Sequence, residues 1–110
     1  MLPTPSRLRA SADFSQAMRG RKSARRLIVA HLEKTSEDRP ARVGFIVNSL
    51  VGNSVARHAV SRKLRHVAAH HLNRLPKGAL LVVRALPGAA VATSADLERE
   101  LDSALSELVA

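Results

Sequence analysis

Cysteine is absent from this chain of 110 residues, and Phe14 and Phe45 are its only aromatic residues. Without cysteine, the chain cannot form a disulfide framework, a thiolate zinc site or a cysteine nucleophile. Two phenylalanines are too few for an RNA-recognition sheet, which stacks bases on several aromatic side chains. These classes are therefore excluded before any motif is considered.

Long apolar runs are missing as well. No segment approaches the ~20 residues that a membrane-spanning helix needs, and the first five residues lack the apolar stretch of a signal peptide. We therefore expect a cytoplasmic protein with no membrane partner. Because 45% of the residues are hydrophobic, we expect residues 1–110 to fold as a single domain rather than to remain a disordered basic tail.

Acidic residues are scarce and unevenly placed. Eighteen Lys and Arg residues outnumber nine Asp and Glu residues, which gives a net charge of +9. Basic side chains crowd residues 7–26 and 57–77, and the second block contains no acidic residue, whereas residues 96–107 are mainly acidic. So large a positive charge makes a compact fold repel itself, so we expect a polyanionic partner, with nucleic acid as the first candidate and an anionic membrane surface as the second.

The pattern of apolar residues predicts the element order α-β-β-α-β-α. Residues 1–10 are expected to form an extended basic arm, because prolines oppose helix there. A helix is predicted from Ser11, as its N-cap, to Met18. Residues 27–32 and 43–47 have strand character, and we expect them to pair as an antiparallel hairpin.

The second half of the chain continues this pattern. A helix is predicted over residues 54–73, capped by Asn53 or Ser54, and a buried strand over residues 79–86. Thr93 and Asp96 have the spacing of a capping box that begins the last helix. The predicted fold class is therefore α/β (an α+β sandwich): a small mixed sheet, with a hairpin and a βαβ crossover, packed by helices.

The helix over residues 54–73 has two different faces. At 100° per residue, the apolar residues Ala56, Val60, Leu64 and Val67 share one face, which we expect to lie on the sheet. The opposite side is basic, with His58, Arg62 and Arg65 at its centre, Arg57 and Ser61 on one edge, and Lys63 on the other. Arginine suits phosphate binding, because its guanidinium bonds two phosphate oxygens and also stacks on bases. The alternative is a face that only keeps the protein soluble, but such faces usually mix charges of both signs.

This stretch resembles the bacterial ribonuclease P protein subunit. That family has the order Gly-Asn-Ser/Ala-Val-x-Arg-Asn-x-x-Lys-Arg-x-Leu-Arg, which the chain matches at Gly52, Asn53, Val55, Arg57, Arg62, Leu64 and Arg65. It differs at His58, where the family usually has Asn, and at Ser49, Leu50 and Ser61, where the family usually has Lys. Residues 8–14, 42–47, 80–84 and 87–89 also resemble the family in the expected order, so the similarity covers nearly the whole chain.

The resemblance implies an RNA-binding subunit of an endonuclease. In this family the RNA subunit hydrolyses the precursor of tRNA at its 5′ leader, using Mg²⁺ held mainly by the RNA, and the protein needs no obligate protein partner. The resemblance assigns binding of the RNA subunit to Asn53, Arg57, His58, Arg62, Lys63 and Arg65. It assigns the single-stranded leader to a cleft between the sheet and the first helix, with Phe14, Met18 and Arg25 as candidate contacts. Phe14 has an alternative role as an apolar anchor of the first helix.

Other functions have less support in the sequence. His66 and His70 have the i, i+4 spacing of metal ligands on a helix, but no metalloprotease glutamate lies between them. No carboxylate near the histidines in the sequence would orient an acid–base pair, so we expect no catalytic residue and no metal site on the chain itself. His71 is expected to be a packed structural histidine. A structural RNA-binding protein, such as a small ribosomal protein, remains the main alternative, and a DNA-binding helical module is less favoured.

Overall fold

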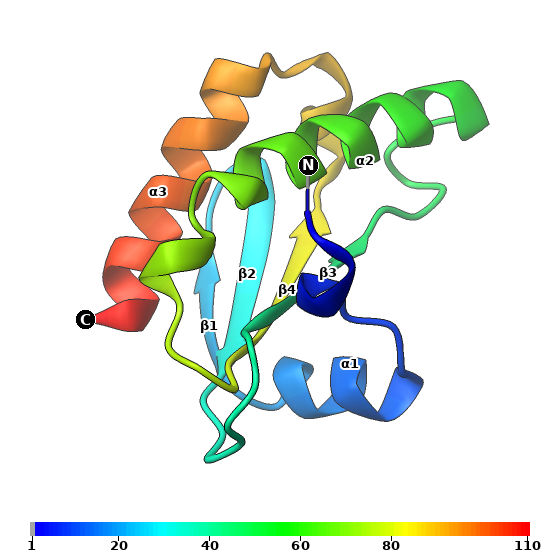
Figure 1. Cartoon of the computed structure of the whole chain (residues 1–110). Coiled ribbons are helices and arrows are strands. Elements are labelled where there is room, and N and C mark those ends of the chain that lie inside the picture. The colour runs from blue at the N-terminus through cyan, green and yellow to red at the C-terminus, as the bar shows by residue number, and fades with distance from the viewer. Residues whose placement is uncertain (1) are drawn as a thin grey trace.

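The computed structural model describes residues 2–110, which form a four-stranded sheet and three α-helices (Figure 1). The strands are β1 (Arg21–Ala24), β2 (Ile28–Glu33), β3 (Arg42–Ile46) and β4 (Leu80–Ala85). The helices are α1 (Ser11–Met18), α2 (Ser54–Ala69) and α3 (Ser94–Val109), with short 3₁₀ turns η1 (Thr4–Ser6), η2 (Leu72–Arg74) and η3 (Pro87–Val91). The predicted fold class is confirmed, with one strand more than the sequence predicts.

The order of the strands in the sheet is β1-β2-β4-β3. β2 pairs antiparallel with both β1 and β4, and β3 pairs parallel with β4. The parallel pair joined by α2 is therefore as predicted, but the predicted hairpin between residues 27–32 and 43–47 is wrong, because β4 lies between them. Almost every residue of β2 is buried, because α1 packs on one face of this strand and α3 on the other.

The hairpin partner of β2 is β1, which the sequence does not predict. Its four residues are polar or small, and only Ser23 is buried. Edge strands tolerate such charged sequences, because one of their sides faces solvent. A sequence pattern based on buried apolar residues therefore misses β1.

Helices cover the two faces of the sheet unequally (Figure 1). On one face, α2 and α3 pack together over the larger core, to which Ile28, Leu64, Leu81 and Leu101 belong. On the other face, α1 packs over a smaller cluster. Thr93 and Asp96 form the predicted capping box at the start of α3. Within residues 2–110, no helix is long and apolar enough to cross a membrane.

Three predicted details differ from the structure. Ala10, not Ser11, occupies the N-cap position of α1, with no side-chain hydrogen bond. α2 ends at Ala69 rather than at residue 73, since the chain turns there and places His71 against α3. The arm predicted over residues 1–10 is folded onto the sheet in its described part, residues 2–10, because its apolar side chains, Leu2 and Leu8, are buried.

The folded N-terminal segment extends the sheet at its open edge. Arg7 forms a parallel bridge with Val43 of β3, and the Leu8 amide donates to the Val43 carbonyl at 2.9 Å. Leu2 joins the larger core and Leu8 the smaller one. The basic side chains of this segment are consequently held in place beside β3 and α2.

Candidate nucleic-acid interface

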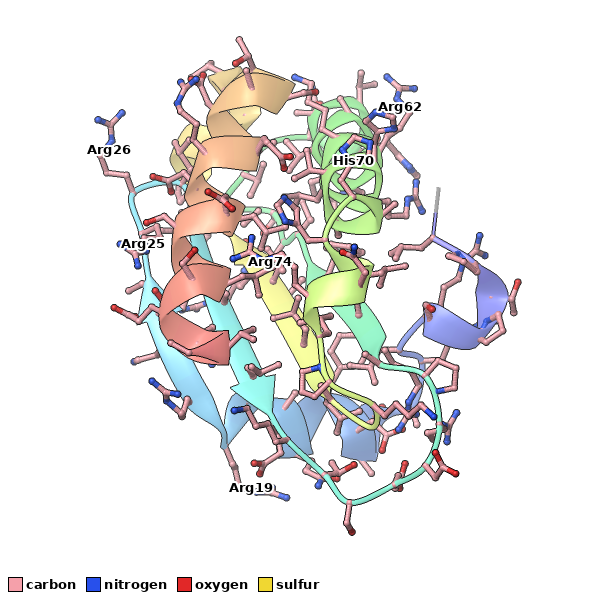
Figure 2. All side chains as sticks on the ribbon, turned by 60° about the vertical axis from the view of Figure 1, so that its left-hand side comes forward. Arg19, Arg25, Arg26, Arg62, His70 and Arg74 are labelled. Carbon is pink, nitrogen blue, oxygen red and sulfur yellow. The ribbon has the colours of Figure 1, made fainter. Side chains whose placement is uncertain are left out.

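Helix α2 turns an apolar side to the core and a basic side to solvent. Val60, Leu64 and Val67 are buried, as predicted. Arg62 and Arg65 are exposed on the other side, and no acidic residue occurs between Ser54 and Ala69. Figure 2 shows Arg62 and His70 on the outer side of α2. The basic side is thus open to a polyanion.

Asn53 and Lys63 have structural contacts that separate them from the other candidates. Asn53 caps α2, because its side-chain oxygen accepts a hydrogen bond from the Ala56 amide at 2.9 Å. The Lys63 ammonium donates to the Ala92 carbonyl in the segment after η3 at 3.0 Å. Asn53 therefore fixes the start of the helix, and Lys63 lies on the edge of α2 that faces η3.

The other edge of α2 forms a ridge of Arg57, Ser61 and Arg65. Residues four apart in a helix lie one above the other on its surface, so the three side chains follow each other along β3. Ser61 lines two adjacent pockets, of about 270 Å³ and about 230 Å³. The larger pocket, which we call the Ser61 pocket, is lined by Leu2, Arg7, Leu8, Arg9, Phe14, Val43, Gly44, Phe45, Ser61 and Arg65. The smaller is lined by Val47, Ser54, Arg57, His58 and Ser61.

Two of the three candidate leader contacts lie together. Phe14 and Met18 both pack against the small apolar cluster under α1, and Phe14 also lines the Ser61 pocket. Arg25 lies beside α3 (Figure 2), where its guanidinium is 3.3 Å from the Ser103 carbonyl and 3.7 Å from the Glu107 carboxylate. The structure therefore joins Phe14 to the basic edge of α2 and does not bring Arg25 to it.

Comparison with known proteins gives one family. The family model for ribonuclease P matches residues 2–109. The ribonuclease P protein component of Streptomyces bikiniensis is 47% identical over 118 aligned residues, which cover 99% of this chain and 96% of the relative. That of Nocardioides sp. is 48% identical over 108 aligned residues, which cover 96% of this chain and 92% of the relative. The chain belongs to the ribonuclease P protein family.

Solved structures show the same fold. The RNase P protein of Staphylococcus aureus has a TM-score of 0.81 at 24% identity, covering 93% of this chain and 94% of that one. The RNase P protein of Thermotoga maritima has a TM-score of 0.75 at 22% identity, covering 94% of both chains. The mixed sheet and its three helices are thus the architecture of ribonuclease P proteins.

This ribonuclease P protein also carries buried polar residues under α1 that the pattern of the sequence does not predict as site residues. His31 of β2 is 5% exposed, and neither of its ring nitrogens has a hydrogen-bond partner within the described residues. Arg84 of β4 likewise has a buried Nε without a partner in this part of the chain. Burial, together with the positive charges of Arg84 and Lys22, lowers the pKa of His31. The sequence feature that indicates these buried polar residues is a histidine in β2 and an arginine in β4, each within a mainly apolar strand.

The remaining histidines have two kinds of surroundings. His71 is buried, as predicted, with Nε2 2.7 Å from the Glu98 carboxylate and Nδ1 3.1 Å from the Arg74 guanidinium. Its two nitrogens are thus engaged in joining the end of α2 to α3. His66 and His70 are exposed, with ring centroids 4.9 Å apart. Residues 2–110 contain no group of three or more His, Cys, Asp or Glu side chains that could hold a metal ion.

Proposed function

We propose that this protein subunit of ribonuclease P binds the RNA subunit through the basic side and the Arg57–Arg65 edge of α2. The observation that supports this most directly is a helix whose exposed side carries Arg62 and Arg65 with no acidic residue in the helix. Phosphate contacts supply most of the affinity of proteins for nucleic acid, and arginine makes them bidentate. The membership of the chain in the family favours this role over that of a ribosomal protein.

We further propose that the chemistry belongs to the RNA subunit. Hydrolysis of the phosphodiester bond needs an activated water, which Mg²⁺ bound to the RNA would supply. The described residues of the protein do not form a group that fits a metal site of its own. The protein would act by binding and positioning RNA, in the cytoplasm and without an obligate protein partner.

The precursor tRNA is the second proposed partner. Phe14 lies in a pocket that reaches the basic edge of α2, so one RNA strand could follow that edge and stack a base on the ring. We propose that this strand is the single-stranded 5′ leader. Of the other candidates, Met18 lies on the same helix as Phe14 and offers an apolar contact only, whereas Arg25 would need a separate segment of RNA beside α3.

Two binding measurements test this function. Affinity for the RNA subunit should fall steeply with salt, because each phosphate contact releases counterions. The holoenzyme should bind precursor tRNA with a leader of several nucleotides more tightly than mature tRNA, which lacks the leader. Binding to the RNA subunit that does not respond to salt would remove the proposed interface on α2, and equal affinity for both tRNAs would remove the proposed leader site.

A further inference from the structure

Helix α3 carries much of the negative charge of the protein. Five of the nine Asp and Glu residues lie in this helix: Asp96, Glu98, Glu100, Asp102 and Glu107. α3 packs against β1 and β2, at the edge of the sheet opposite to β3. These carboxylates therefore lie on the side of the molecule away from the ridge of Arg57, Ser61 and Arg65.

Two of these carboxylates pair with arginines from the basic parts of the chain. The Asp102 carboxylate is 2.6 Å from Nη1 of Arg74, whose Nη2 also donates to the Ser106 hydroxyl at 3.0 Å. The Glu107 carboxylate is 3.7 Å from the Arg25 guanidinium. Figure 2 shows Arg25 and Arg74 beside α3, and both side chains are only partly exposed. α3 thus neutralises one arginine from each of the two basic blocks.

The C-terminal end of α3 engages a third arginine. The Arg21 guanidinium donates to the carbonyls of Leu108 and Glu107 at 3.2 and 3.4 Å, where the helix dipole is negative. The arginines of the basic side of α2 differ in this respect. Arg57, Arg62 and Arg65 form no ion pair within residues 2–110. The cations of the protein are therefore divided into an internally paired group beside α3 and an unpaired group on α2.

We propose that α3 is a screening helix, whose carboxylates keep Arg25 and Arg74 from binding phosphate and so restrict RNA to the side formed by α2 and β3. A phosphate that approaches either arginine meets a carboxylate of its own sign beside the guanidinium, which opposes binding. Proteins commonly distinguish partners by such repulsive groups as well as by attractive ones. This inference rests on the proposed function and adds to it the residues that exclude RNA from one side. On this account Arg25 does not contact the leader.

Removing one carboxylate charge at a time tests the inference. Asp102→Asn keeps an oxygen that accepts a hydrogen bond from Arg74 but leaves the charge of that arginine unpaired. Glu33→Gln is the matched control, because it changes the net charge equally, and Glu33 forms no ion pair within the described residues. Arg74→Gln/Asp102→Asn removes both partners and restores the net charge.

Two RNAs serve as probes, an unstructured oligouridylate and the RNA subunit. Affinity for each is measured with the wild type and all variants at several salt concentrations, and a melting curve checks folding. Glu107→Gln, which leaves Arg25 unpaired in the same way, is an independent second variant at an exposed position.

Asp102→Asn and Glu107→Gln should each bind the oligouridylate at least about threefold more tightly than the wild type at about 50 mM salt. The reason is that one added phosphate contact on a single strand steepens the dependence of log affinity on log salt concentration by about 0.7. Glu33→Gln and Arg74→Gln/Asp102→Asn should stay within about twofold of the wild type, which is well below the gain from one such contact. The preference for the RNA subunit over the oligouridylate should consequently fall in the two variants that leave an arginine unpaired.

Two results would overturn the screening role of α3. An equal rise for Asp102→Asn and Glu33→Gln would show that net charge alone acts, and no rise for either α3 variant would show that the carboxylates do not restrain these arginines. If the wild type binds the RNA subunit no better than the oligouridylate, the proposed function fails, whereas the comparison of variants on the oligouridylate still decides the role of α3.

Discussion

The ring of Phe14 lies against Gly44 of β3, at a point where any side chain on residue 44 would overlap it. The salt bridge between Asp13 and Arg42, with 2.7 Å between Oδ2 and Nη1, fixes the same end of α1 to the same strand. Glycine at position 44 is thus what allows the aromatic ring to reach both the sheet and the Ser61 pocket.

Gly44→Ala should displace Phe14 and destabilise the protein. Overpacking of this kind costs about 1–3 kcal/mol, and each kcal/mol lowers the melting temperature of a domain of this size by roughly 4–8 °C. The double variant Gly44→Ala/Phe14→Ala should lose less stability than the two single variants combined, because the overlap no longer exists. Thermal unfolding of the four proteins measures this coupling, and strict additivity would show that the two residues do not constrain each other.

Phe14→Ala should weaken binding of leader-bearing precursor tRNA to the holoenzyme and leave mature tRNA nearly unchanged. A stacked base contributes about 1–3 kcal/mol by alanine substitution. Phe14→Leu restores packing without stacking, and Met18→Phe adds an aromatic side chain to the same helix, which should tighten leader binding. If Phe14 is only an anchor for α1, its loss lowers thermal stability, Leu restores that stability, and both tRNAs respond equally.

Arg57→Ala/Arg62→Ala/Arg65→Ala should weaken binding to the RNA subunit without unfolding the protein. Each lost phosphate contact flattens the dependence of log affinity on log salt concentration by roughly 0.7–0.9, so the slope should change by roughly 2–3 for three contacts. Affinity measured at several salt concentrations gives the slope. A triple variant that binds normally at physiological salt would leave the basic side of α2 with a solubilising role only.

Acid should destabilise the protein partly through His31. Because burial and two nearby cations lower its pKa in the folded state, the unfolded chain takes up the proton first as the pH falls. The stability that the fold has with His31 neutral is fully present above the ordinary histidine pKa, near 6.5. It is lost progressively as the pH falls below that value, because only the unfolded chain then binds the proton readily. Between pH 7.5 and 5.5, the melting temperature of the wild type should therefore fall more than that of His31→Phe. His58→Gln, at an exposed position, is the control, and an equal fall in wild type and His31→Phe would contradict this role.

Periodic apolar residues predicted most of the fold. The stripe of α2, the capping box of α3 and the buried strand β4 are each determined by local sequence, and the structure confirms them. Local sequence does not determine the order of the strands in the sheet. β4, from a distant part of the chain, inserts between β2 and β3. The short polar strand β1 gave no apolar signal, and its place depends on pairing with β2.

The sequence predicted which residues of α2 belong to the candidate site, but not which residues of other segments lie beside them. Helical spacing identifies which side chains share a face, so the exposed positions of His58, Arg62 and Arg65 followed from the sequence. The Ser61 pocket depends on Arg9 and Phe14, which reach α2 only after the N-terminal segment folds onto β3. The resemblance groups Arg25 with Phe14, but Arg25 directly follows β1, which lies at the opposite edge of the sheet from β3.

Reconstitution with the RNA subunit tests the central claim most directly. Cleavage of a precursor tRNA at its 5′ leader is measured with the RNA subunit alone, with the protein alone and with both, at a low Mg²⁺ concentration. The account predicts no cleavage by the protein alone and faster cleavage by the complex than by the RNA alone, with the gain greatly reduced for the triple arginine variant. Cleavage by the purified protein without RNA, or no gain on adding it to the RNA subunit, would contradict the account.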